Sequence, residues 1–333
     1  MAKINDVARL ANVSTATVSR VLSNADNVTE ETREKVLEAI QRLKYQPNIL
    51  GRYLRRMETK TVLVVVPDIT NSFFSKILLG IESVAVKSGY QVLLVDTQNS
   101  VHLEVEYLNL LRQKQVDGMI LLTARMNREE IEEIAEQFPV VLACEYLEGS
   151  RIPTVSIDNI SSARKATEHL IQLGHRRIAH ISGPMNIVLS RDRLRGYQQA
   201  MTQYELEIDP VLIQEGDFSY EIGYNLAMKF LALENPPTAI FAASDDMAIG
   251  AVKAVREQSL NVPKDIAVVG FDDVKIASIF EPSITTIAQP MYEIGTTAME
   301  LLVKLINGNQ LKRRQYVLED QLIIRETCGG NAC

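Results

Sequence analysis

Apolar residues recur at helical spacing in three short stretches near the start of the chain. The first stretch carries them at the i, i+3, i+4 and i+7 positions of residues 4–11, which places them on one helix face. The second begins at Ser14, a residue type that caps helix N-termini, and turns Val18 and Val21 inward. The third begins at Thr29, has two glutamates in its first turn and ends before Pro47. These patterns predict three short helices around one small core.

The first two predicted helices are separated by a very short connection. It consists of Asn12 and Val13, so the chain must turn sharply there. Asparagine tolerates the left-handed backbone conformation that such a turn requires. Two helices joined by a tight turn and closed by a third are typical of a helix-turn-helix unit, whose second helix enters the major groove of DNA.

The outward positions of the second predicted helix are small or polar, with one arginine. They are Thr15, Ala16, Thr17, Ser19 and Arg20. Short side chains let a helix approach base edges, and hydroxyl and guanidinium groups can donate to bases and phosphates. The alternative is a three-helix packing module whose surface is polar for no functional reason. The charge distribution favours DNA contact, because residues 1–60 carry a net charge of +4 while the remainder carries −11.

Residues 47–60 connect this unit to the rest of the chain. A short basic helix is indicated, with Asn48 at a capping position and Leu54 and Arg55 within it. A helix this short is marginal in water, and Gly51 weakens it further. We therefore expect the segment to become helical on DNA, with Asn48, Leu54 and Arg55 as contacts and Leu54 as a wedge in the minor groove. The alternative is an ordinary solvated linker.

From Thr61 onward, apolar runs alternate with longer helical patterns. The runs that predict strands are residues 61–67, 90–97, 118–124, 139–146, 154–158, 177–183, 239–245, 266–272, 284–290 and 322–326. The early runs are nearly continuous in Val, Ile and Leu, as expected for parallel strands that are covered on both faces. The alternation predicts a doubly wound α/β fold, and the number of strands favours two sub-domains over one sheet.

Polar, acidic and aromatic residues follow several of these runs. They are found at 68–74, Asp96, Glu145, 244–246 and Asp272. Because ligands bind outside the carboxyl ends of strands in open α/β sheets, these residues predict a site for a small polyhydroxylated molecule with a flat apolar part. Each acidic residue taken alone is also compatible with a turn or a helix cap.

Several functional classes are disfavoured by the composition and by the motifs. The net charge of −7 and the 46 % of hydrophobic residues are typical of a soluble globular protein, and no secretory signal or membrane-spanning run is present, so we expect a cytoplasmic protein with no membrane partner. Three cysteines at unrelated positions indicate reduced thiols. No nucleotide-binding, zinc-protease or serine-hydrolase motif occurs, and the histidines lack metal-ligand spacing, so we expect no enzyme, no cofactor and no metal.

The whole chain resembles the lac repressor and galactose repressor family of bacterial transcription regulators. The strings that carry the resemblance are INDVARLANVSTATVSRVL, YQPN followed by GRYLRR, DITNSFFSKILLGIE, LGHRRIAHISGP, RLRGY, SDDMAIGA, VVGFDD and ITTIAQP. The resemblance implies a helix-turn-helix head and a two-lobed core that is similar to periplasmic sugar-binding proteins, with three crossings between the lobes and the effector between them. It also implies a homodimer that binds a palindromic operator.

The resemblance also implies roles for particular residues. Thr15, Ala16 and Arg20 match base-contacting positions, and Leu54 matches an intercalating leucine. The positions that match ligand contacts are Phe73, Phe74, Glu145, Arg193, Phe218, Ser244 and Asp272. Arg193 and Asp272 could chelate neighbouring hydroxyls as charged donor and charged acceptor. The aromatic residues favour a nucleoside as effector, with a free or phosphorylated sugar as the second choice.

Three departures from the family pattern affect what is expected. Asn12 stands where the family usually has a turn glycine, and Gly51 stands where it has a hinge alanine. The chain ends in CGGNAC without leucine heptads, so we expect a dimer and no tetramer.

The expected domains are a head at 1–46, a hinge at 47–60 and a core at 61–333. Within the core we expect an N-lobe at 61–158 and 289–319 and a C-lobe at 159–288 and 320–330. The predicted function is an effector-controlled transcriptional regulator, and we expect it to act as a repressor. The alternative is a sugar- or nucleoside-binding protein or enzyme with an incidental basic N-terminus.

Overall fold

The computed structural model describes residues 2–22, 27–45 and 58–330. The chain divides into two compact units, Met1–Glu58 and Thr59–Cys333. Each unit has its own hydrophobic core, and each is considered separately below.

The first unit contains three helices, α1 (Ile4–Leu10), α2 (Thr15–Leu22) and α3 (Glu30–Leu43). They meet around Val7, Val18 and Val36, whose side chains are fully buried. The predicted helices are therefore present, and their inward faces are the apolar stripes of the sequence. The third helix ends at Leu43, and the next residue, Lys44, adopts a left-handed conformation three residues before Pro47.

The second unit holds two six-stranded sheets, each in its own lobe. The strands of the first lobe, in spatial order, are β11 (Gln315–Leu318), β5 (Thr154–Ile157), β4 (Val140–Ala143), β3 (Gly118–Leu121), β1 (Thr61–Val66) and β2 (Gln91–Asp96). Those of the second lobe are β12 (Gln321–Ile323), β10 (Thr285–Ala288), β9 (Ala267–Asp272), β8 (Ala239–Ala242), β6 (Ile178–Ser182) and β7 (Ile213–Glu215). All pairings are parallel except that of β10 with β12. The predicted α/β class is confirmed.

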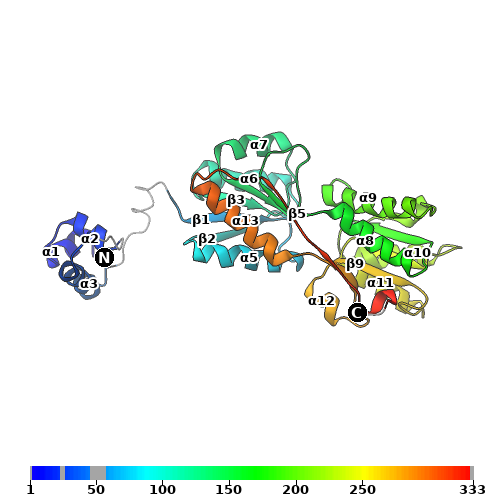
Figure 1. Cartoon of the computed structure of the whole chain (residues 1–333). Helices are drawn as coiled ribbons and strands as arrows, with labels where there is room; N and C mark the ends of the chain where they lie inside the picture. Colours follow the sequence, from blue (N-terminus) through cyan, green and yellow to red (C-terminus); the bar gives the residue numbers. More distant parts are fainter. Residues whose placement is uncertain (1, 23–26, 46–57, 331–333) are drawn as a thin grey trace. The chain divides into compact units, whose positions relative to one another are not determined.

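Helices cover both faces of each sheet (Figure 1). In the first lobe, α6 (Val101–Arg112) and α7 (Arg128–Gln137) lie on one face, and α5 (Phe73–Lys87) and α13 (Met291–Ile306) lie on the other. In the second lobe, α8 (Asn159–Gln172) and α9 (Val188–Gln203) lie on one face, and α10 (Tyr220–Leu231) and α11 (Asp245–Glu257) lie on the other. The short elements are α12 (Lys275–Ile279), η1 (Pro210–Leu212) and η2 (Glu326–Cys328). This double covering explains why the strands are nearly continuous in apolar residues.

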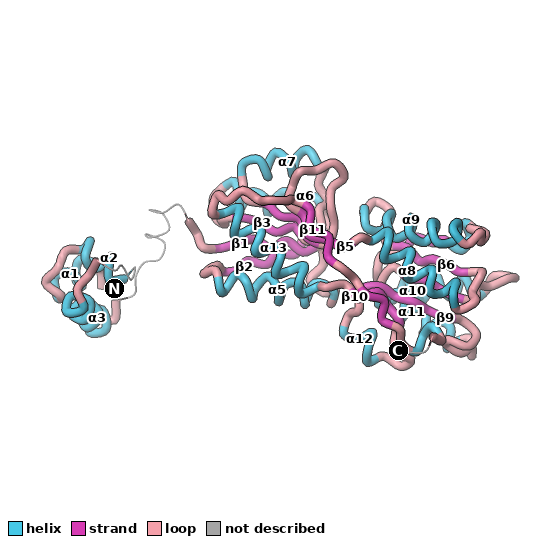
Figure 2. The backbone as a smooth tube through the Cα atoms, viewed as in Figure 1, coloured by secondary structure: helices cyan, strands magenta, loops and turns pink. Residues whose placement is uncertain are grey.

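The chain passes between the lobes three times, after β5, after β10 and between β11 and β12 (Figure 2). Because the parallel strands of each sheet run toward the other lobe, their carboxyl ends face one another across the crossings. Two strands, β7 and β11, were not predicted. Both are at or near sheet edges, and β11 alternates exposed and half-buried residues, so neither produces an apolar run.

Two glycines set the close packing of α5 on α13. A Cβ on Gly80 would lie 2.3 Å from the carbonyl oxygen of Tyr292, and a Cβ on Gly295 would lie 2.1 Å from that of Ile77. The two helix backbones can therefore meet only where both positions lack a side chain. This contact fixes the start of α5, which borders the candidate site.

Candidate functional site

The outer face of α2 is the first candidate site. Thr15, Ala16, Ser19 and Arg20 are exposed, and Thr17 is half-buried. On the opposite side of the helix, Val18 is fully buried. The structure therefore places the predicted DNA-contacting residues of this helix on its surface rather than in the core of the unit.

The turn before α2 has the geometry that the sequence indicated. Asn12 has a φ of 52°, which confirms the predicted left-handed conformation. The amide of Thr17 donates to the Ser14 hydroxyl oxygen over 3.1 Å, so Ser14 caps the helix as predicted. The other predicted DNA contacts, Asn48, Leu54 and Arg55, lie outside the described residues.

The second candidate site is a cavity of about 340 Å³ at the facing carboxyl ends of the two sheets. It is lined by residues from both lobes that lie at or after the ends of β1, β2, β3, β4, β6, β7, β8, β9 and β10. They are Pro67, Asp68, Asn71, Phe73, Phe74, Asn99, Thr123, Arg125, Cys144, Pro184, Asn186, Ile187, Leu189, Arg193, Asp217, Phe218, Ser244, Asp245, Asp246, Asp272, Val274 and Gln289. The location agrees with the rule that open α/β sheets bind ligands at their carboxyl edge.

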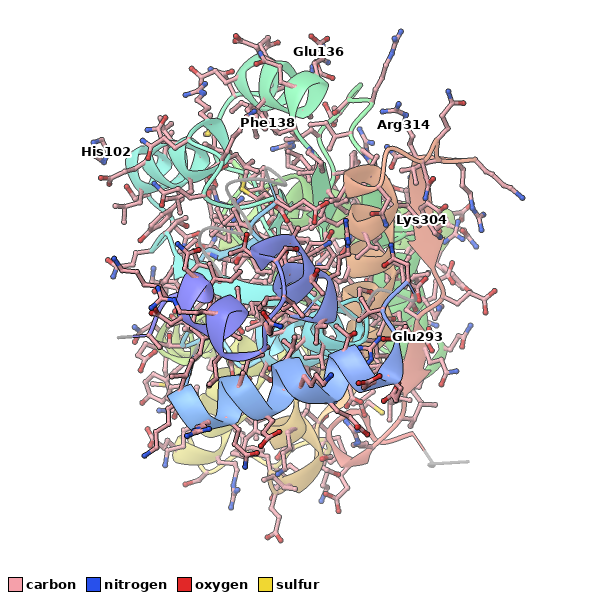
Figure 3. All side chains as sticks on the ribbon, turned by 90° about the vertical axis from the view of Figure 1, so that its left-hand side faces the viewer. His102, Glu136, Phe138, Glu293, Lys304 and Arg314 are labelled. Atoms are coloured by element: carbon pink, nitrogen blue, oxygen red, sulfur yellow. The ribbon has the colours of Figure 1, made fainter. Side chains whose placement is uncertain are left out.

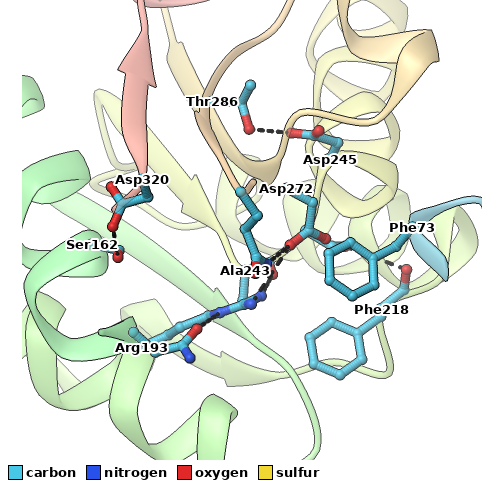
Figure 4. Close-up of polar contacts among 12 residues, drawn as sticks. Phe73, Ser162, Arg193, Phe218, Ala243, Asp245, Asp272, Thr286 and Asp320 are labelled. Atoms are coloured by element: carbon cyan, nitrogen blue, oxygen red, sulfur yellow. Dashed lines mark hydrogen bonds and ion pairs between the residues drawn. The ribbon is translucent and has the colours of Figure 1, made fainter. Parts of the chain in front are cut away.

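Arg193 is held rigidly in the wall of this cavity (Figure 4). It is only 4 % exposed, and its guanidinium group stacks on the ring of Phe271 at 3.7 Å from the centroid. Its Nε donates to Asn159 Oδ1 over 2.9 Å, and its Nη1 donates to the carbonyl oxygen of Ala243. Its Nη2 lies 3.6 Å from Asp272 Oδ1. The guanidinium is thus oriented before any ligand arrives.

Asp272 lies at the end of β9, opposite Gln289 at the end of β10. Gln289 Nε2 donates to Asp272 Oδ1 over 2.7 Å. Burial raises the pKa of Asp272 to about 7, although the positive charge of Arg193 and the Gln289 amide both favour the carboxylate. A ligand hydroxyl that donates to this carboxylate would take over part of the solvation that burial removes.

The neighbouring Asp245 is also buried, at the start of α11. Its carboxylate accepts hydrogen bonds from the Thr286 hydroxyl over 2.6 Å and from the Val274 amide over 2.9 Å. Burial raises the pKa of Asp245 well above its usual value, and the nearby charge of Asp272 adds to this effect. Asp245 therefore joins β9, β10 and α11 at the floor of the site.

The predicted aromatic residues border the cavity from both lobes. Phe73 and Phe74 come from the first turn of α5, with their rings edge to face at 5.1 Å. Phe218 comes from the loop after β7 in the other lobe, and its ring rests on Gly183, where an added Cβ would lie 2.0 Å from the ring. Figure 4 shows the rings of Phe73 and Phe218 on the same side of Asp272. The two lobes thus each supply an aromatic surface to the same space.

Ser244 and Glu145 have structural partners of their own. Ser244 caps α11 by accepting from the Met247 amide over 3.2 Å, and it also borders the cavity. Glu145 does not line the cavity, because its carboxylate accepts from Arg125 Nη1 over 2.9 Å and from the Ala124 amide over 3.1 Å. Burial raises the pKa of Glu145, and Arg125 opposes this effect. Glu145 therefore positions Arg125, and Arg125 is the group that reaches the cavity wall.

Sequence reasoning missed several lining residues, notably Arg125 and Gln289, whereas Asn71 falls within the predicted strand-end group 68–74. Gln289 follows β10 directly, so the strand-end rule could have found it. Arg125 follows β3 by four residues, and no local pattern distinguishes it from a surface arginine. Only its pairing with Glu145, twenty residues away, brings it into the wall.

The histidines are outside this site. His102 lies on the outer surface of α6 (Figure 3), and His180 is buried between the rings of Tyr197 and Phe241. Among residues 2–22, 27–45 and 58–330, no group of three or more metal-ligating side chains is placed to hold an ion. No helix in the same ranges is both long enough and apolar enough to cross a membrane.

Two parts of the chain match known protein families. Residues 3–48 match the bacterial regulatory proteins of the lacI family, and residues 167–328 match the periplasmic binding protein-like domain. The chain is 42 % identical over 325 residues to the HTH-type transcriptional repressor CytR of Escherichia coli K12, which covers 97 % of this chain and 95 % of that protein. Segments 68–82, 216–223 and 285–299 are the parts of the chain that most resemble the cytidine repressor within this family.

Solved structures show the same likeness. The transcriptional regulator CelR in complex with cellobiose is 34 % identical, with a TM-score of 0.75 over 98 % of this chain and 100 % of that one. The lac repressor dimer bound to operator and the anti-inducer ONPF is 30 % identical, with a TM-score of 0.90 over 98 % of this chain and 99 % of that one. These likenesses extend over nearly the whole chain.

Proposed function

The chain belongs to the lacI family of bacterial regulatory proteins, and on that premise we propose how it acts as an effector-controlled transcriptional repressor. A homodimer binds a palindromic operator through α2 of each protomer, and a nucleoside or sugar-like effector in the cavity controls that binding. The predicted family, fold class and general function agree with every relative described above. The effector, the contact residues and the domain boundaries are the parts we propose.

The observation that supports the DNA-binding role most directly is the outer face of α2. Thr15, Ala16 and Arg20 are exposed there, on a helix whose other side is fixed by Val18 and Val21. A helix of this kind enters the major groove, where hydroxyl, methyl and guanidinium groups read base edges. We assign residues 1–46 to this head, 47–60 to a hinge that contacts the minor groove, and 61–333 to the effector-binding core.

We propose that the cavity binds the flat ring of the effector between Phe73 and Phe218. Arg193 and Asp272 then bind neighbouring hydroxyls of a ribose or hexose, because a fixed donor and a fixed acceptor lie side by side in the wall. A nucleoside has both the flat ring and the neighbouring hydroxyls that these residues would bind, whereas a free sugar has only the hydroxyls.

Effector binding is coupled to DNA binding through the three crossings between the lobes. A ligand that contacts both lobes stabilises one lobe angle over another, and in a dimer this angle sets the spacing of the two heads. We expect a coupling free energy of about 1–3 kcal/mol. The relatives are regulators, and we propose that the cavity binds its ligand without converting it.

The test starts with selection of binding sites from random duplex DNA by the full chain. We expect a palindromic site, with an affinity that falls steeply as salt rises because several phosphates are neutralised. Calorimetry with nucleosides and sugars, for the wild type and Asp272→Ala, then tests the cavity. Failure to enrich a palindrome would contradict the DNA-binding role, and equal ligand affinity in Asp272→Ala would remove that residue from the site.

A further inference from the structure

The charges that line the cavity are unequal. Its wall contains five aspartates, Asp68, Asp217, Asp245, Asp246 and Asp272, and two arginines, Arg125 and Arg193. No lysine or histidine is among the described residues that line it. The composition of the wall is therefore strongly acidic for a site of this size.

Both arginines already have carboxylate partners. Arg125 Nη1 lies 2.9 Å from Glu145 Oε1, and Arg193 Nη2 lies 3.6 Å from Asp272 Oδ1. Arg193 also gives one hydrogen bond each to Asn159 and Ala243. Neither guanidinium therefore offers the wall an uncompensated positive charge.

Three of the aspartates, Asp68, Asp217 and Asp246, have no cationic partner among the described residues. Asp68 accepts from the amide and hydroxyl of Thr70 over 2.8 and 2.6 Å, and Asp217 accepts from the amide of Ser219 over 2.9 Å. Within the described ranges, no ion pair reaches either residue or Asp246. Amide and hydroxyl donors satisfy hydrogen-bonding capacity but do not neutralise charge, so these carboxylates keep the wall negative even where Asp245 and Asp272 are protonated.

The helix N-termini at the cavity do not reverse this balance. In α11, the first turn contains Asp245 and Asp246 and is capped by Ser244. In α5, the amide of Phe73 donates to the Asn71 side chain. The start of α9 contributes a partial charge of roughly +0.5, which is less than one carboxylate.

We infer that the cavity selects an uncharged or cationic polyhydroxylated effector and rejects the phosphorylated form of the same molecule. This inference rests on the proposed function, and it decides between the candidate effectors: a nucleoside rather than a nucleotide, and a free sugar rather than a sugar phosphate. A phosphate dianion would meet unpaired carboxylates in a partly dehydrated space, where like charges repel more strongly than in water. The pKa values of Asp245, Asp246 and Asp272 are all raised, each first by burial, so the positive charge near these carboxylates does not offset their desolvation.

Calorimetry on the full chain with matched pairs of ligands tests the inference. The pairs are cytidine and cytidine 5′-monophosphate, adenosine and adenosine 5′-monophosphate, ribose and ribose 5-phosphate, and glucose and glucose 6-phosphate. We expect at least one unphosphorylated member to bind, with its phosphorylated partner weaker by about a hundredfold or more. Equal or tighter binding of a phosphorylated member would overturn the inference, and so would the failure of every unphosphorylated member to bind.

Removal of the unpaired carboxylates identifies the cause. In the double variant Asp217→Asn/Asp246→Asn, we expect the affinity for the phosphorylated ligand of a pair to rise about tenfold. The ratio of the affinities for the unphosphorylated and phosphorylated ligands should fall accordingly. Asp68→Asn, in the other lobe, gives an independent variant if the double variant does not fold. Glu106→Gln, on the exposed side of α6, is the matched control and should leave the discrimination unchanged. Unchanged discrimination in both the double variant and Asp68→Asn would overturn the inference.

Operator binding separates this inference from the proposed function. If the chain binds no palindromic duplex, the proposed function fails, whatever the cavity binds. If operator binding is intact and a phosphorylated ligand is preferred, only the charge-based selectivity fails.

Discussion

The outer face of α2 and the wall of the cavity both offer polar groups to a ligand, but they hold those groups differently. On α2 the candidate contacts are exposed, and the packing of the unit depends on the opposite side of the helix. In the cavity, Arg193, Asp245 and Asp272 are buried, and each is hydrogen-bonded to the protein around it. Their partners are the Ala243 carbonyl, the Val274 amide and the Gln289 side chain, respectively.

This difference has a thermodynamic consequence. Surface residues away from caps and cores can be changed at a cost within about 0.5 kcal/mol, whereas a buried charge that loses its partner costs several times more. Substitutions on the outer face of α2 should therefore change DNA binding alone, and substitutions in the cavity should change ligand binding and stability together. The following experiments test this contrast, in order of decreasing effect on stability.

Arg193→Ala should have the largest effect. It leaves Asp272 buried without its cation and removes the donors to Asn159 and Ala243. We expect the free energy of unfolding of the core to fall by about 3 kcal/mol in urea denaturation. Arg191→Ala, an exposed neighbour on the same helix, is the control and should cost less than about 1 kcal/mol. Similar losses in the two variants would contradict the structural role of Arg193.

The pH dependence of stability should be next in size. The pKa of Asp272 is raised to about 7 in the folded protein from an ordinary value of 3.8, so between these values the folded chain retains a proton that the unfolded chain has lost. Stability should consequently fall as pH rises from 5 to 7, by about 2 kcal/mol, and level off above that.

Asp272→Asn tests the assignment of this slope. The variant should show a shallower slope between pH 5 and 8, and a residual slope of the same sign should remain because burial also raises the pKa of Glu145 and Asp245. The midpoints of urea unfolding, measured at several pH values, give the slope of stability against pH for the wild type and for the variant. An unchanged slope in the variant would show that Asp272 does not titrate in this range.

Gly183→Ala should have a moderate effect. The new methyl group would lie 2.0 Å from the ring of Phe218, so the ring must move out of its position against the loop after β6. We expect a loss of about 1 kcal/mol in stability and about tenfold in effector affinity. Addition of Gly183→Ala to Phe218→Ala should cost little more, because the ring is already gone. Additive losses in this double-mutant cycle would mean that the two residues do not act on one another.

Thr15→Ala should have the smallest effect on stability, within about 0.5 kcal/mol, while operator affinity falls by roughly tenfold. Val18→Ala, three positions along the same helix, should do the reverse and lower the stability of the head by about 2 kcal/mol because its side chain is fully buried. Thermal unfolding and gel-shift titration of both variants measure the contrast. A stability loss in Thr15→Ala as large as that in Val18→Ala would contradict it.

The same contrast explains what could be predicted from the sequence. The helices of the head follow from local spacing, and both the left-handed Asn12 and the Ser14 cap follow from local chemistry. Strand ends located the cavity, and Asp272 with Arg193 could be matched to the family pattern. The pairing of Arg125 with Glu145 could not be predicted, because it joins residues twenty apart whose neighbours give no sign of it. The edge strand β11 was missed because its alternating exposure gives no apolar run.

The affinity of Arg20→Ala for the selected operator tests the central claim most directly. At fixed salt, we expect the operator affinity of this variant to be about ten- to a hundredfold lower than that of the wild type. Arg112→Ala, which changes an exposed arginine on α6, should keep the wild-type affinity. Equal affinities for wild type and Arg20→Ala would contradict recognition of DNA by the outer face of α2.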